Sequence, residues 1–286
     1  MFLVSGVELV VATSGAGLCG TFPTLNARTT EALDLWLGEM GERLAGKPFG
    51  ANLIVHKSNP RVAEDLALLV KHKVPLVITS LGAVPDVIEA VHSYGGMVLH
   101  DVISIRHAKK ALGAGADGLV AVCAGAGGHS GTISPFALTA EIRAFFDGPL
   151  ALSGALTHGR HIAAARVMGA DFGYIGSHFI AAAESLAADG QKQMMVEGKA
   201  ADIVLTDKVT GVAANFLRQS LEAATLSDGH GEMTVLDEAK AWKTIWSAGH
   251  GVGSTLAIRP AADICSDLIT QYHEALSREA LKGMQS

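Results

Sequence analysis

Short apolar runs alternate with segments of helical periodicity from residue 18 to about residue 176 of the chain. The runs are almost continuously apolar, as expected of parallel strands that are buried on both faces. The predicted strands lie at residues 18–22, 50–55, 76–79, 97–102, 118–123, 150–153 and 172–176. The predicted helices lie at residues 29–44, 61–73, 84–93, 105–114, 135–146 and 159–168. The pattern therefore predicts an α/β protein built from successive β–α units.

A similar short motif occurs at the start of three predicted strands: GADGL at 115–119, GPLAL at 148–152 and GADFG at 169–173. The intervals between these entries match the length of one β–α unit. Such a repeat is typical either of a (β/α)8 TIM barrel or of an open, doubly wound sheet. We favour the barrel, because seven strands follow one another with no domain break before residue 180.

The beginning and the end of the chain depart from this repeat. Residues 5–16 predict a helix that precedes the first recognisable strand, so we expect strand one to be missing, or else short, at residues 2–4. Residues 1–183 are predicted to form the barrel, and residues 184–286 to add its last helix and a helical extension over the barrel mouth in the same unit. Helical stretches in this second part are predicted at 184–197, 218–225, 239–246 and 261–281.

Composition narrows the class of protein. The chain has 286 residues, of which 49% are hydrophobic and 17% charged, and its formal net charge is −6. A large core is therefore expected, and a nucleic acid or an anionic membrane is not expected as a partner. No apolar segment has the length of a membrane span, and the three cysteines are far apart, so we expect a cytoplasmic protein. The sequence contains no paired histidine motif of the kind that binds a metal, so no metal site is predicted.

Two glycine motifs invite a phosphate-binding interpretation. GAGLCG at 15–20 matches G-x-G-x-x-G, but a helix precedes it and a strand follows, the reverse of the dinucleotide-binding arrangement. Ser153, Gly154 and Ala155 follow the strand at 150–153, whereas Gly176 and Ser177 follow the next one. In (β/α)8 barrels the loops after strands seven and eight commonly bind phosphate through backbone N–H groups. Ordinary strand-to-helix turns explain the same residues equally well.

A third glycine-rich loop, CAGAGGHSG at 123–131, carries a single histidine, His129. It is the only histidine or charged side chain between Asp117 and Glu141. Catalytic groups of barrels lie at the carboxyl ends of strands, and an imidazole, with an ordinary pKa of about 6.5, is suited to acid–base chemistry. We therefore predict that Gly128 and its neighbours give a ligand close access and that His129 acts on it. Asp101 or His100, at the end of another strand, could line the same mouth of the barrel.

Several segments resemble the nitronate monooxygenase family, formerly called 2-nitropropane dioxygenases. They are AGAGGHSGTISPFALTAEIRAFFDGPLALSGALTHGR, GADFGYIGSHFIAAAES, NLIVHKSNPR, VPLVITSLGA, VHSYGGMVLHDV and KTIWSAGHGVGS. The resemblance implies an FMN-dependent barrel, with His129 as the base near the flavin. It implies FMN contacts from Asn52, Ser153, Gly154, Ala155, Gly176 and Ser177.

The implied reaction is the oxidation of alkyl nitronates or nitroalkanes with O2 to carbonyl compounds and nitrite. Two other readings remain open: an NAD(P)H-dependent flavin reductase acting on a quinone or an enoyl thioester, and a non-catalytic flavin-binding protein. The partners expected are a small-molecule substrate, O2 and a second copy of the chain in a homodimer. The chain departs from the family at Ser177-His178, where relatives often have Thr-Arg or Ser-Arg, and at Asp101, where some relatives have a lysine.

Overall fold

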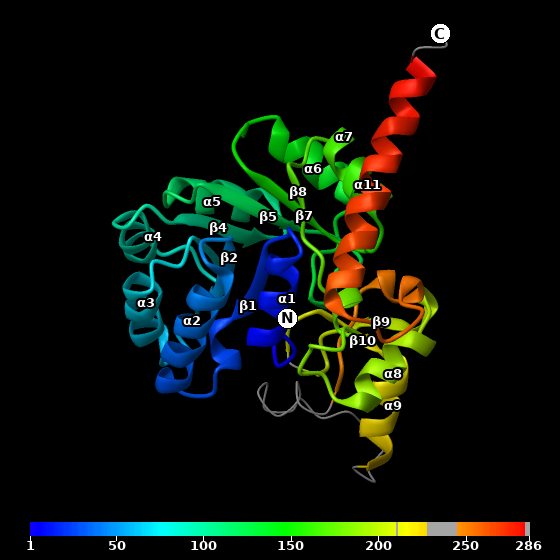
Figure 1. Cartoon of the computed structure of the whole chain (residues 1–286), viewed down its shortest axis with the longest axis horizontal. Helices are drawn as coiled ribbons and strands as arrows, with labels where there is room; N and C mark the ends of the chain where they lie inside the picture. The colour runs from blue at the N-terminus through cyan, green and yellow to red at the C-terminus, as the bar shows by residue number, and fades with distance from the viewer. Residues whose placement is uncertain (210, 228–244, 284–286) are drawn as a thin grey trace.

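A curled sheet of seven parallel strands lies at the centre of the computed structural model, which describes residues 1–209, 211–227 and 245–283 (Figure 1). The strand order is β1-β2-β3-β4-β5-β7-β8. The bounds are β1 (Gly20–Pro23), β2 (Phe49–Ile54), β3 (Leu76–Ser80), β4 (Met97–Val102), β5 (Gly118–Val122), β7 (Leu150–Ser153) and β8 (Phe172–Gly173). All seven predicted strands are present, in one α/β sheet, and the predicted parallel pairing is confirmed.

Helices cover the outer face of this sheet. They are α1 (Val7–Gly15), α2 (Thr30–Leu44), α3 (Val62–Lys71), α4 (Pro85–His92), α5 (Ile105–Gly113), α6 (Pro135–Arg143) and α7 (Gly159–Val167). Local chemistry sets some of their ends: the Thr29 side chain accepts a hydrogen bond from the Ala32 N–H at the start of α2. Leu33 of α2 and Leu138 of α6 are fully buried in the same apolar cluster as Leu53 of β2. This cluster fixes the orientation of the strands from β1 to β7 in the central sheet, because outward-facing residues alternate with inward-facing ones.

The long helix α11 (Ala261–Gly283) lies in the helical layer beside α7 and α1 (Figure 1). Gly159 at the start of α7 allows the approach, since a Cβ there would lie 2.2 Å from the Tyr272 nitrogen and 2.3 Å from the Leu268 carbonyl oxygen. Gln271 accepts a hydrogen bond from the Gly159 N–H at 3.0 Å. The far end of α11 extends beyond the rest of the molecule (Figure 1).

Among the described residues, no eighth strand joins β8 to β1. Residues 2–4 form a turn, so the short first strand considered at this position is absent. The two edge strands are instead bridged by side chains: the Thr21 hydroxyl of β1 and the Tyr174 hydroxyl, just after β8, are 3.3 Å apart. The sheet is therefore barrel-like but has a gap between its edges.

The segment after residue 183 contains strands as well as helices, whereas only helices were predicted there. A second, antiparallel sheet has the order β6-β10-β9, formed by β6 (Gly128–His129), β9 (Ile203–Thr206) and β10 (Ala214–Leu217). The helices of this segment are α8 (Asp189–Glu197) and α9 (Arg218–Ser227), with a 3-10 turn, η4 (His250–Ser254). Runs of four residues are too short for their periodicity to separate strand from helix, which explains the wrong prediction.

Two further predictions differ in detail. The helix predicted at 184–197 begins only at Asp189, and residues 239–244 of the helix predicted at 239–246 lie outside the described residues. Ile245 and Trp246 are described and are not helical. Within the described parts of the chain, no helix is both long enough and apolar enough to cross a membrane.

Candidate active site

The inward-facing residues of the sheet form two layers of different character. The deeper layer is apolar and consists of Ile78, Leu99, Val120 and Ala151. The layer above it, at the carboxyl ends of the strands, is mostly polar and contains Asn52, Ser80, Asp101 and Ser153, with Val122 of β5 as its apolar member. We call this polar layer the floor. It faces a cavity at the end of the barrel where active sites are built.

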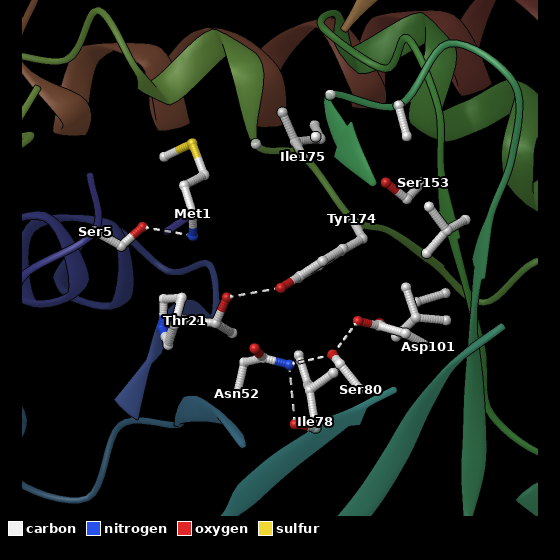
Figure 2. A pocket seen from close by; sticks show the side chains of 18 of the residues that line it. Met1, Ser5, Thr21, Asn52, Ile78, Ser80, Asp101, Ser153, Tyr174 and Ile175 are labelled. Atoms are coloured by element: carbon white, nitrogen blue, oxygen red, sulfur yellow. Dashed lines mark hydrogen bonds between the residues drawn. The ribbon is translucent and has the colours of Figure 1, made fainter. Parts of the chain in front are cut away.

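Three floor side chains are joined by hydrogen bonds across three neighbouring strands (Figure 2). Asn52 Nδ2 donates to the Ile78 carbonyl oxygen at 3.1 Å and to Ser80 Oγ at 2.7 Å. Ser80 Oγ in turn donates to Asp101 Oδ2 at 2.5 Å. Because a carbonyl oxygen only accepts, the amide nitrogen of Asn52 must face Ile78, and the direction of the whole chain of hydrogen bonds is fixed.

Asp101, the last member of this series of hydrogen bonds, is a half-buried acid. Its Oδ1 is shielded from solvent and has no hydrogen-bond partner among the described residues. Burial raises the pKa of the Asp101 carboxyl to about 6, partly offset by the hydrogen bond from Ser80. The neighbouring His100 was the other candidate for this position; its Nδ1 lies 2.6 Å from Thr79 Oγ1.

The loops after β7 and β8 present backbone N–H groups to the cavity. Gly154 has a φ of 147° and Ala155 a φ of 55°, so the chain turns sharply where β7 ends. Within the described residues, no hydrogen bond uses the N–H groups of Ala155, Gly176 or Ser177. Backbone N–H groups without a protein partner, on two loops that line one cavity, are candidates for binding an anion. The adjacent His178 contributes nothing to it, since its imidazole lies 3.1 Å from the Thr255 hydroxyl.

His129 lies opposite the floor, on strand β6 of the small sheet. It pairs with Ala214 of β10, and the next β10 residue, Asn215, donates from Nδ2 to the Ala126 carbonyl oxygen at 2.7 Å. Two contacts hold η4 and the preceding Gly249 against two loops of the site. His250 N–H donates to the Gly125 carbonyl oxygen in the loop of His129 at 3.0 Å, and Gly249 N–H donates to Ser177 Oγ, in the loop after β8, at 2.8 Å. We call β6, β10 and residues 249–254 the roof.

Close backbone contacts with other parts of the chain account for two of the glycines around His129. A Cβ on Gly127 would lie 2.7 Å from the Gly249 nitrogen, and a Cβ on Gly131 would lie 2.4 Å from the Val122 carbonyl oxygen. The predicted reason, access for a ligand, therefore does not explain these two positions. They are glycines because other parts of the chain pass against them.

Floor, loops and roof line a cavity of about 2120 Å³, which also reaches residues at the amino ends of central strands, Pro48, Pro75 and Met97 among them. All eight residues predicted for the site line it: Asn52, Gly128, His129, Ser153, Gly154, Ala155, Gly176 and Ser177. Ser80 and Asn215 were not predicted to belong to the site. A polar residue closing the apolar run LVITS was a usable signal for Ser80, whereas nothing in the local sequence connects Asn215 with residue 126.

Comparisons with known proteins agree with this architecture. The chain is 27% identical over 218 residues to the (3aS,4S,5R,7aS)-5-hydroxy-7a-methyl-1-oxo-octahydro-1H-indene-4-carboxyl-CoA dehydrogenase of Rhodococcus jostii, a match covering 76% of this chain and 61% of the relative. It is 24% identical over 268 residues to the nitronate monooxygenase of Paraburkholderia phytofirmans, covering 85% and 73%. The structure of FabK from Thermotoga maritima superposes with a TM-score of 0.83 at 26% identity, covering 99% of this chain and 93% of that one.

The extent of these matches differs. The chain spans about three fifths of the length of several curated relatives that it matches, the dehydrogenase among them. The description of the nitronate monooxygenase family, by contrast, matches residues 1–270 of this chain. Because that match covers nearly the whole sequence, the chain belongs to the nitronate monooxygenase family, whose members are flavin-dependent oxidoreductases.

Proposed function

We propose that this protein binds FMN in the cavity between floor and roof and oxidises alkyl nitronates and nitroalkanes with O2, giving carbonyl compounds and nitrite. One observation supports the proposal: the eight residues predicted for the site, seven of which the family resemblance assigns to the flavin and its base, all line a single cavity. These residues come from segments as far apart as Asn52 and Ser177, so their convergence is a property of the fold.

The residues at the site suit a flavin. The free N–H groups of Ala155, Gly176 and Ser177 are donors for the FMN phosphate. Polar groups of the floor, Asn52 and Asp101 among them, suit the polar edge of the ring system.

Each residue then has a separate task. The flavin supplies the redox chemistry when bound. Asn52, Ser153, Gly154, Ala155, Gly176 and Ser177 hold and orient it. His129 takes the proton from the acidic carbon of a nitroalkane; a nitronate has already lost that proton and does not need the base. The roof places the imidazole over the cavity and limits the access of water.

A second candidate is a reductase or dehydrogenase acting on a thioester. The observation in its favour is the 27% identity to a relative named as a carboxyl-CoA dehydrogenase. The same floor, loops and histidine would serve that chemistry, with a nicotinamide nucleotide as the electron donor or acceptor.

Anaerobic mixing separates the two candidates. Protein loaded with FMN is mixed either with propionate-3-nitronate or with NADH and NADPH, and the flavin absorbance near ~450 nm is followed. We expect the nitronate to bleach the flavin and the nicotinamide nucleotides to leave it oxidised. Bleaching by NADH or NADPH alone would contradict the nitronate proposal and favour the reductase. Absence of bound flavin after incubation with FMN would contradict both.

A further inference from the structure

Asp101 is a half-buried carboxyl group to which the proposed oxidation assigns no proton transfer. It lines the cavity, and its Oδ1 has no partner among the described residues. A buried polar atom without a partner costs free energy, of the order of 1–3 kcal/mol, unless a ligand satisfies it. This atom therefore identifies a contact that the protein alone does not complete.

The hydrogen bonds of the floor determine which oxygen of Asp101 carries a proton. Ser80 Oγ accepts from Asn52 Nδ2, so its single hydroxyl proton is directed to Asp101 Oδ2. Oδ2 is thus an acceptor. When the carboxyl is protonated, the proton resides on Oδ1, the atom that has no protein partner. The protonated acid is therefore a donor to a bound ligand.

The adjacent Asn52 has the complementary character. Both hydrogens of its amide are used, by the Ile78 carbonyl oxygen and by Ser80, which leaves Asn52 Oδ1 as an acceptor only. The floor thus offers an acceptor and a donor separated by one serine. A cyclic imide, with N–H beside C=O, is complementary to this pair, and the flavin ring carries such an edge.

Resting on the flavin site proposed above, we infer that Asp101 binds the cofactor as a neutral acid, its Oδ1–H donating to an acceptor on the ring, so that FMN binding takes up a proton at Asp101. Asn52 and Ser80 are positioning residues in this arrangement. The acid is a specificity group as well, because a ligand without an acceptor at that place leaves Oδ1 unsatisfied.

Few other groups near Asp101 change charge between pH 6 and 8. The Met1 amino group faces it, but burial lowers the pKa of that amine to about 5. Tyr174 faces it from beyond β8, and burial raises the pKa of its phenol far above neutrality. The other two neighbours do not titrate: Ser80 on β3, and Val120 on β5, which is the register partner of Asp101. His129 belongs to the roof and is the same in every floor variant.

The affinity for FMN is expected to depend on pH through Asp101. The Asp101 carboxyl has a pKa of about 6 in the free protein and a higher pKa with its proton engaged by the ligand. FMN affinity is therefore greatest below pH 6. It falls as the pH rises above 6, by up to about tenfold per pH unit, until the pKa of the complex is reached.

Asp101→Asn tests this directly, because the amide keeps an oxygen to accept from Ser80 and puts a permanent N–H donor where Oδ1–H would be. The dissociation constant for FMN is measured by flavin fluorescence quenching from pH 5.5 to 8.5 in both proteins. We expect similar affinities at pH 5.5, and at pH 8 at least about tenfold tighter binding by the variant. Changes in the FMN phosphate, which titrates near pH 6, are common to both proteins and cancel in the ratio.

Two further measurements keep the inference testable if that variant unfolds. Calorimetry on the unaltered chain at pH 7, in two buffers of different ionisation enthalpy, is expected to show net proton uptake on binding riboflavin, which has the same ring and no phosphate. Ser80→Ala removes the hydrogen bond that lowers the pKa of Asp101, so the fall in affinity is expected to shift to higher pH.

Three results would overturn the inference: weaker FMN binding by Asp101→Asn at every pH, parallel pH profiles in the two proteins, or proton release on riboflavin binding. The first would make Asp101 an acceptor, and the second would remove it from the ligand contact. In all three cases tight FMN binding would leave the proposed flavin site intact. Absence of FMN binding by either protein would contradict the flavin site and this inference together.

Discussion

The floor and the roof face the same cavity but are held in different ways. Floor residues such as Asn52, Ser80 and Asp101 lie on consecutive parallel strands, and the register of those strands brings them together. The roof joins His129, Asn215 and Gly249, which are far apart in sequence, through antiparallel pairing and a few loop contacts. The floor is thus a product of the β–α repeat, whereas the roof exists only once the last third of the chain has folded back.

This difference has a functional consequence. Parallel strands packed by helices on one side hold their side chains rigidly, which suits the binding of a ring system. The roof depends on a small number of hydrogen bonds and on glycine contacts. Variants in the roof are therefore expected to affect proton transfer at His129 more than FMN binding, and variants in the floor the reverse.

The largest expected effect is that of removing the roof imidazole. His129→Asn is expected to lower kcat/KM for a nitroalkane by about 10²–10⁴-fold, the usual contribution of a general base, and to affect a nitronate far less. Steady-state oxygen consumption with both substrates measures this. His250→Asn is the matched control: it alters an exposed imidazole but keeps the backbone N–H that donates to Gly125, so it should be nearly neutral. Equal losses with both substrates would contradict the role of base.

The next effect tests the glycine contact within the roof. Gly127→Ala places a Cβ 2.7 Å from the Gly249 nitrogen and is expected to reduce the free energy of unfolding by about 1–3 kcal/mol. Gly41→Ala, in α2 with open space around it, should instead stabilise by roughly 0.5–1 kcal/mol. Chemical denaturation of both variants provides the comparison. A neutral Gly127→Ala would show that the segments 127 and 249 are not in contact.

A smaller effect is expected from the hydrogen bond that anchors β10 to the loop of His129. Asn215→Ala leaves the Ala126 carbonyl oxygen without its buried donor, so stability should fall by about 1 kcal/mol. Nitroalkane turnover should fall with it, while the dissociation constant for FMN stays within about twofold. Ser80→Ala in the floor, measured in the same assays, is expected to change FMN binding and to spare the imidazole. If Asn215→Ala mainly weakened FMN binding and Ser80→Ala mainly slowed nitroalkane turnover, the division between floor and roof would be contradicted.

The smallest effect concerns backbone strain in the loop after β7. Ala155 has a φ of 55°, a left-handed conformation that costs an L-residue about 1–2 kcal/mol. Ala155→Gly relieves this cost but makes the unfolded chain more flexible, so a net gain of about 0.5 kcal/mol is expected. Ala137→Gly, at an exposed position in α6, is the control and should destabilise by about 1 kcal/mol. Destabilisation by Ala155→Gly as large as in the control would mean that the loop is unstrained.

The difference between floor and roof also determines how much of the site could be predicted from the sequence. Continuous apolar runs predicted all seven central strands, and small residues at the ends of β7 and β8 predicted the loops of the cavity. His129 was singled out because it stands alone in a glycine-rich loop, and its role stays a prediction. The roof could not be predicted, because β6, β9 and β10 are two to four residues long and their pairing is fixed by distant contacts. The task of Gly127 depends on Gly249, and no local pattern connects these two positions.

The central claim is that floor and roof together hold one flavin. A crystal structure of the whole chain grown with FMN tests it most directly. We predict the ring between Asp101 and His129, and the phosphate at the N–H groups of Ala155, Gly176 and Ser177. Density for FMN at any other place, or a cavity filled only by solvent in crystals grown with saturating FMN, would contradict the account.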